Sequence, residues 1–181
     1  MLISKFGTEN ISEKIEIYED RANIKLPEQL RNFIEKYNGG ETPNTKFNSN
    51  GISSDVKAFY GLGKVKYSFD SVKIIEDNGN RYLPFALDSF GNELVIDITS
   101  GAILFMDHEK GELQRLADDF KSFVDICDSS PINPSSIKSI EEREQDLIKN
   151  GHGSIITDAL RDMWKTEIDK YTSIKQEKVN L

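Results

Sequence analysis

The residues best suited to chemistry in this chain are Asp107-His108-Glu109, which stand together at the end of a β-rich stretch. Carboxylates and imidazoles are groups that bind metals or transfer protons. However, a zinc site normally needs three or four ligands, and a catalytic triad needs a nucleophile beside an oriented base. His108 and His152 are the only histidines, and successive residues of a strand point to opposite sides. We therefore expect a loop at the end of a strand, with no metal site and no catalytic residue.

Other stretches resemble binding motifs but lack required members. Gly61-Leu62-Gly63-Lys64 matches part of a phosphate-binding loop, but Ala58 and Val65 stand where the first glycine and the final hydroxyl are needed. Asp77-Asn78-Gly79-Asn80 is too short for a calcium loop and predicts a turn. Cys127 falls on the apolar face of a predicted helix, which favours a place in the core. The sequence therefore contains no enzyme signature, and we expect no cofactor.

The second feature with chemical consequences is an excess of acidic side chains. The 181-residue chain has 31 aspartates and glutamates against 23 lysines and arginines, a formal net charge of −8. Residues 88–128 hold ten acids and three bases, so this segment alone carries −7. This balance argues against nucleic-acid binding and favours a basic protein partner. The ordinary alternative is a solvated acidic surface with helix caps and turns.

Some of these acids have an expected structural role. Asp88 is expected to bond backbone N–H groups in its own turn, and Asp118 or Asp119 is expected to cap a helix. Glu93 and Asp97 are expected to face outward from the sheet without such a role. The candidates for contact with a partner are Glu93, Asp97, Asp107, Glu109 and Glu112.

The elements that must position these residues begin with two helices. Apolar residues recur every three or four positions over residues 11–22 and 27–37. Asn10 and Glu13 predict a capping box at the start of the first helix. Asn38-Gly39-Gly40 ends the second helix, because glycine adopts the left-handed conformation of a helix C-terminus. Residues 41–55 are polar and predict a loop.

A strand-rich block follows. Strands are predicted over residues 56–62, 82–87, 93–98, 102–106 and 113–117, with a helix from about residue 119. The period of two places Leu94, Ile96, Ile103 and Phe105 on one apolar face, which belongs to the core. The opposite face is mixed, so it is either partly covered or available to a partner.

Residues 128–136 read as a linker broken by two prolines, followed by predicted helices over residues 137–149 and 157–171. Residues 173–181 are polar and expected to fray. We therefore expect a domain over residues 1–128, with residues 129–181 forming a linker and a helical C-terminal extension packed on the domain or extending from it. No apolar run approaches the roughly 20 residues that span a bilayer. Met1–Asn10 has no signal-peptide core, so we expect a cytoplasmic protein without membrane contact.

Three groups of short motifs occur in a recognisable order. They are Leu26-Pro27 with Asn38-Gly39-Gly40, then Phe59-Tyr60-Gly61-Leu62-Gly63, then Leu83-Pro84-Phe85-Ala86-Leu87-Asp88 with Gly91-Asn92 and Asp107-His108-Glu109. Over residues 9–127 the chain resembles the SUKH superfamily, which groups bacterial toxin-immunity proteins with fungal cell-wall regulators of the Smi/Knr type. Tyr82 and Met106 stand where that superfamily often has tryptophan.

The resemblance implies an α+β fold, a single domain with helices packed on one curved antiparallel sheet. It also implies a binding protein that is not an enzyme. The first hypothesis is an immunity protein whose acidic sheet surface blocks a cognate toxin, a basic nuclease. The second is a regulatory or scaffold protein whose tail after Ser130 recruits a partner. The third and weakest is an enzyme. The oligomeric state stays open.

Overall fold

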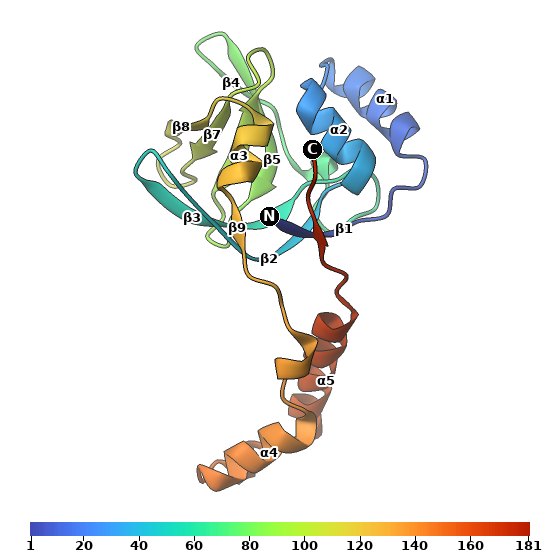
Figure 1. Cartoon of the computed structure of the whole chain (residues 1–181), viewed down its shortest axis with the longest axis vertical. Helices are drawn as coiled ribbons and strands as arrows, with labels where there is room; N and C mark the ends of the chain where they lie inside the picture. The colour runs from blue at the N-terminus through green and yellow to red at the C-terminus, as the bar shows by residue number, and fades with distance from the viewer. The chain divides into compact units, whose positions relative to one another are not determined.

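Alternation of inward and outward side chains builds one antiparallel sheet of ten strands in the order β10-β1-β2-β3-β5-β6-β7-β8, with β4 on β5 and β9 on β2. The computed structural model describes residues 1–181. The strands are β1 (Leu2–Lys5), β2 (Gly40–Ser49), β3 (Ile52–Phe59), β4 (Ile75–Asp77), β5 (Asn80–Leu87), β6 (Glu93–Asp97), β7 (Ile103–Met106), β8 (Leu113–Ala117), β9 (Asp128–Ser129) and β10 (Glu177–Lys178). With three of the helices (Ile11–Ala22, Glu28–Tyr37 and Phe120–Ile126) packed on this sheet, the α+β prediction is confirmed (Figure 1).

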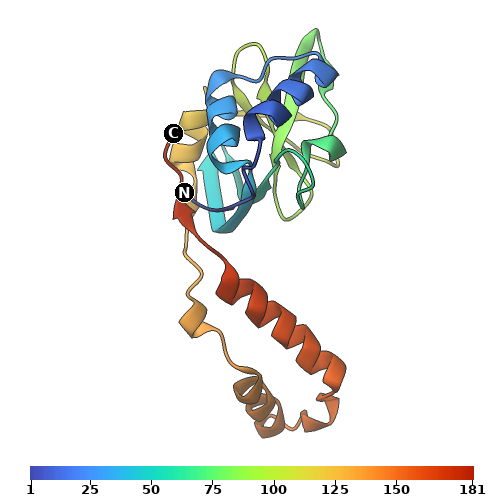
Figure 2. The same ribbon diagram turned by 90° about the vertical axis from the view of Figure 1, so that its right-hand side faces the viewer.

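The chain divides into two compact units. The first contains Met1–Pro131 and Gln176–Leu181, and the second contains Ile132–Lys175. The last six residues therefore belong with the sheet. Both ends of the chain lie side by side at one strand pair, where Leu2 of β1 pairs with Lys178 of β10 (Figures 1 and 2). No helix is both long enough and apolar enough to span a membrane.

The expectation that residues 173–181 fray is wrong. Val179 is buried in the main core, and its backbone N–H donates to the carbonyl of Met1 at 3.0 Å. The backbone N–H of Asn180 donates to the hydroxyl of Tyr37 at 2.9 Å. The tail is therefore held because β10 pairs with β1. Only two residues of β10 are paired, which is too few to produce a recognisable alternation of apolar and polar residues in the sequence.

The loop expected over residues 41–55 is also wrong, because β2 and β3 form a hairpin there. Asn50 and Gly51 have φ of 51° and 81°, as the tightest two-residue hairpin turn requires. Thr45 and Phe47 of β2 point inward and are buried, while Lys46 between them is exposed. The sequence signal was Asn50-Gly51, which is typical of a hairpin even when the flanking strands are polar.

Three helices belong to the first unit, namely α1 (Ile11–Ala22), α2 (Glu28–Tyr37) and α3 (Phe120–Ile126). The predicted capping box of α1 is absent, because Asn10 is left-handed and its side chain makes no cap bond. Pro27 is the N-cap of α2 and lies just before its first turn. The predicted cap of α3 is confirmed, since Asp119 accepts a hydrogen bond from the Ser122 N–H at 2.7 Å.

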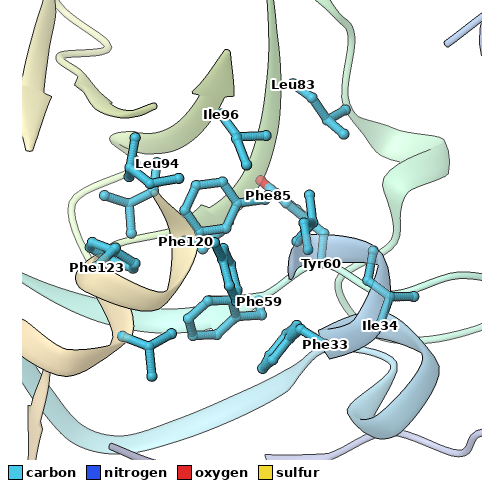
Figure 3. Close-up of a cluster of buried hydrophobic side chains, with 14 of the residues drawn as sticks. Phe33, Ile34, Phe59, Tyr60, Leu83, Phe85, Leu94, Ile96, Phe120 and Phe123 are labelled. Carbon is cyan, nitrogen blue, oxygen red and sulfur yellow. The ribbon is translucent and has the colours of Figure 1, made fainter. Parts of the chain in front are cut away.

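Aromatic rings fill the space between the helices and the sheet (Figure 3). The ring of Phe120 in α3 lies 5.4 Å from that of Phe85 in β5 and 5.1 Å from that of Phe33 in α2. Phe59 of β3 closes the group at 5.0 Å from Phe33. Tilted and edge-on contacts of this kind add stabilisation beyond burial alone, so these rings fix α2 and α3 to the sheet.

The residues of the glycine motifs pack closely against Asn38, which is fully buried. Asn38 donates from Nδ2 to the carbonyls of Gly7 and Leu62 at 2.7 and 3.2 Å, and its Oδ1 accepts from the Leu62 N–H at 2.7 Å. A Cβ on Gly61 would lie 2.1 Å from the Asn38 carbonyl oxygen, and one on Gly39 would lie 2.5 Å from that of Tyr60. These motif residues therefore lock the end of α2 against the segment after β3.

The second unit contains α4 (Ile140–Lys149) and α5 (Asp158–Ser173), as the sequence predicts. Ser139 and Glu142 form a capping box at the start of α4. Arg143 of α4 pairs with Glu167 of α5 at 2.9 Å, and its guanidinium lies over the ring of the buried Trp164 at 5.9 Å. The two helices thus have a small apolar and ionic contact of their own.

Candidate partner-binding surface

The triplet Asp107-His108-Glu109 forms part of the turn that follows β7, as expected. Oδ1 of Asp107 accepts hydrogen bonds from the N–H groups of Glu109 and Lys110 at 2.9 and 3.1 Å, and these bonds lower the pKa of the Asp107 carboxyl. The His108 N–H donates to Oδ1 of Asn92 at 3.1 Å, and its Nδ1 lies 2.8 Å from the same atom. No group of three or more potential metal ligands gathers here or elsewhere in the protein. The triplet therefore builds a turn.

Four of the five candidate carboxylates lie at one end of the sheet. Glu93 begins β6 and pairs with Met106, the last residue of β7, so the turn after β7 lies beside it. The side chains of Glu109 and Glu112 in this turn are exposed and make no hydrogen bond or ion pair. The set Glu93, Asp107, Glu109 and Glu112 is called the acidic end below. One base lies among them, Lys110, whose Nζ is 3.7 Å from Oδ2 of Asp107.

Asp97 lies apart from the acidic end and has a structural role that the sequence did not indicate. It ends β6, so it stands four residues from Glu93, about 13 Å along an extended strand. Its Oδ1 accepts hydrogen bonds from the N–H groups of Thr99 and Ser100 at 2.8 and 3.1 Å. This carboxylate therefore closes the turn between β6 and β7.

The structure confirms the expected role of Asp88, whose carboxylate bonds backbone N–H groups in its own turn. Its side chain is 1% exposed, and its two oxygens accept four hydrogen bonds at 2.7–2.9 Å. The donors are the N–H groups of Phe90 and Asn92, the side-chain amide of Asn92 and the hydroxyl of Ser54. Because its lone pairs already accept hydrogen bonds inside the protein, the Asp88 carboxylate is not available to bind a partner.

Glu93 differs from Asp88 and Asp97 because its half-buried carboxylate accepts no backbone N–H and has no basic partner. Its one polar contact is the hydroxyl of Tyr60, 3.5 Å from Oε1. Burial raises the pKa of Glu93 above its ordinary value, although the Tyr60 hydroxyl opposes the shift. Burial and the nearby Glu93 charge raise the pKa of Tyr60 to about 12. A desolvated carboxylate without a counter-charge costs folding stability.

Apolar side chains continue from Glu93 across the outward face of the sheet. Met106 of β7 stands between Glu93 and Leu113 of β8 in one row, and all three are half-buried. In the next row Val95 is buried and Leu104 is half-buried. The mixed face of the sequence prediction is therefore partly covered, and it retains apolar area beside the acidic end.

Phe90 is the residue at this end that sequence patterns did not single out. It occupies the turn between β5 and β6 with 73% of its surface exposed. A phenylalanine in the middle of Asp88-Ser89-Phe90-Gly91-Asn92, where polar residues prevail, was the available signal.

Two other places are accounted for by structural bonds. A cleft of about 300 Å³ lies between the β6–β7 turn and the starts of α2 and α3. Its polar groups bind one another, since Oε1 of Gln29 accepts from the Lys121 N–H at 2.8 Å and its amide lies 3.4 Å from Asp119. Cys127 is buried, and burial raises the pKa of its thiol to about 12. The side chains of Gln29 and Asp119 are thus held by internal bonds, and the Cys127 thiol is shielded from solvent.

Comparison with known proteins agrees with this fold. A model of the SUKH_6 family, described as SMI1-KNR4 cell-wall, matches residues 12–124, which include the whole acidic end. The chain is 27% identical over 156 residues to the SPbeta prophage-derived uncharacterized protein YokK of Bacillus subtilis (strain 168), covering 71% of this chain and 80% of the relative. No solved structure matches the chain. The family match confirms the resemblance drawn from the sequence motifs.

Proposed function

Because the chain belongs to the SMI1-KNR4 cell-wall family of the SUKH superfamily, we propose that it is an immunity protein that binds and neutralises a cognate bacterial toxin. The toxin is a nuclease with a basic surface, and the acidic end is the part that meets it. Binding requires no catalysis by this chain, and it takes place in the cytoplasm, where such a nuclease finds its substrate.

The observation that supports this proposal most strongly is the state of Glu93. Its carboxylate is half-buried without a basic partner, so ionisation costs energy in the free protein. A lysine or arginine from another protein would supply the missing counter-charge. A nuclease has such groups, because its active site must attract phosphates. Glu109 and Glu112 add exposed carboxylates beside this position, which favours fast, electrostatically guided association.

The first test is co-expression with the toxin encoded beside the gene for this chain. Protected cells and a co-purified complex are the expected result. Dying cells and no complex would show that the immunity function is wrong.

The second test locates the surface by charge reversal. Glu109→Lys with Glu112→Lys changes two exposed side chains that make no internal bonds, so the fold is expected to stay intact. Association with the toxin should slow by about tenfold or more and depend less on salt. Glu13→Lys with Glu16→Lys is the matched control, because it changes the net charge equally at two exposed positions on α1. Equal slowing in both variants would mean that net charge matters and the acidic end does not.

A regulatory or scaffold function is the second candidate, and the helical unit favours it. Ile148, Ile155 and Met163 expose 62%, 54% and 57% of their surface, although each is apolar. If this function holds, no toxin complex forms, and removal of residues 132–175 abolishes recruitment of the regulated partner.

A further inference from the structure

Phe90 is an exception among the aromatic residues of this protein. Eight of the ten phenylalanines are buried, and Phe90 leaves 73% of its surface in water. A single exposed apolar residue is ordinary by itself. Whether Phe90 can contribute to binding depends on whether the backbone around it is mobile or fixed, because ordering a mobile segment on binding costs entropy.

The turn that presents Phe90 is held from inside by Asp88. This buried carboxylate accepts the Phe90 N–H at 2.9 Å and the Asn92 N–H at 2.8 Å, so the backbone on both sides of Gly91 is fixed. A hydrogen bond from the hydroxyl of Ser54 at 2.7 Å ties the same carboxylate to β3.

Neighbouring segments hold the turn from outside as well. The Ser89 N–H donates to Asp55 of β3 at 3.0 Å. Asn92 accepts the His108 N–H at 3.1 Å, which joins this turn to the one after β7. The backbone on either side of Phe90 is thus bonded to two other parts of the sheet, and its ring can contact another molecule with little loss of backbone entropy.

The surroundings of Phe90 define what it can contact. The acidic end adjoins the turn through Glu93 and His108, and the half-buried Met106 and Leu113 continue from Glu93 as apolar surface. An apolar ring beside carboxylates complements a partner that has an apolar pocket with lysine or arginine around it. Aromatic residues, phenylalanine included, are enriched in protein interfaces relative to the rest of the surface.

We propose that Phe90 is the apolar anchor of the toxin complex, seated in an apolar pocket of the toxin whose rim is basic. This inference rests on the proposed immunity function and assigns the two parts of the surface different roles. The carboxylates of the acidic end set the rate of association, and Phe90 sets the rate of dissociation.

The experiment measures association and dissociation of the toxin complex for Phe90→Ala, with Ile17→Ala as the matched control. Ile17 is an apolar residue with 58% of its surface exposed, on α1. Phe90→Ala should dissociate about thirtyfold faster or more, while its association rate and its salt dependence stay unchanged. Ile17→Ala should behave as the unaltered chain. Both variants should keep its melting temperature, because neither side chain is buried.

The possible outcomes separate the two proposals. If the toxin binds and Phe90→Ala dissociates at the unaltered rate, the anchor is wrong and the immunity function stands. If Ile17→Ala dissociates as fast as Phe90→Ala, the effect is not local and the anchor is also wrong. If no complex forms with the unaltered chain, both proposals fall.

Discussion

Substitution of Gly61 by alanine tests whether the glycine motifs are structural. The added Cβ would lie 2.1 Å from the carbonyl oxygen of Asn38, about 1 Å closer than such atoms normally approach. Asn38 cannot move aside easily, because it is fully buried and its side chain bonds Gly7 and Leu62. The segment after β3 must therefore separate from the end of α2.

The size of the effect follows from these contacts. Overpacking of a buried site costs about 1–3 kcal/mol. Loss of two of the three hydrogen bonds of the Asn38 side chain adds about 1 kcal/mol each. The free energy of unfolding should therefore fall by about 3–5 kcal/mol for Gly61→Ala, which corresponds to a decrease of about 10 °C in melting temperature for a chain of this size.

Gly7→Ala is the matched control for this measurement. Neither glycine has a left-handed backbone, so the substitutions differ only in what the Cβ meets. At Gly7 it meets the end of the flexible Glu9 side chain at 2.5 Å, and this side chain can rotate away. Gly7→Ala should stay within about 1 kcal/mol of the unaltered chain. Thermal melting followed by circular dichroism compares the two. Melting temperatures within about 2 °C of each other would refute the close-approach argument.

Three further predictions follow from burial and strand pairing. Because the folded state raises the pKa of Glu93 above 4.5, its ionisation destabilises the fold as the pH rises through the folded pKa. Glu93→Gln should therefore increase the free energy of unfolding at pH 7, and this increase should disappear below pH 4.5. Urea titrations that find the same difference between the variant and the unaltered chain at both pH values would contradict the raised pKa of Glu93. Leu2 pairs with Lys178, and its backbone N–H donates to the hydroxyl of Ser129 at 2.8 Å, so the two ends of the first unit are held together without residues 132–175. Replacement of residues 132–175 by a short glycine-serine linker should therefore leave the first unit folded. Loss of cooperative melting in that variant would show that the first unit depends on the second. Cys127 should react with a thiol reagent only when denaturant unfolds the chain, whereas rapid labelling of the folded protein would show that its burial is incomplete.

Local sequence patterns determined most of the elements and much of the core. The apolar period of α2 and the alternation of β6 and β7 predicted which side chains are buried, and the pairs Leu94–Phe105 and Ile96–Ile103 form as expected. These signals are local, because a helix or a hairpin brings together residues that are near in sequence. The family resemblance came from short motifs that the structure shows to be turns and close contacts, such as Asn38 with Gly61.

Long-range contacts decided the rest. The tail pairs with β1 across the whole length of the chain, and the polar strand β2 is completed by β1, β3 and β9. No local period reports such pairing. The acidic residues were known from composition, but only strand pairing showed that Glu93 stands beside the turn after β7 while Asp97 closes a turn at the other end of β6. The half-burial of Glu93 and the rigid exposure of Phe90 likewise arise from neighbours distant in sequence, so the tertiary structure alone could reveal them.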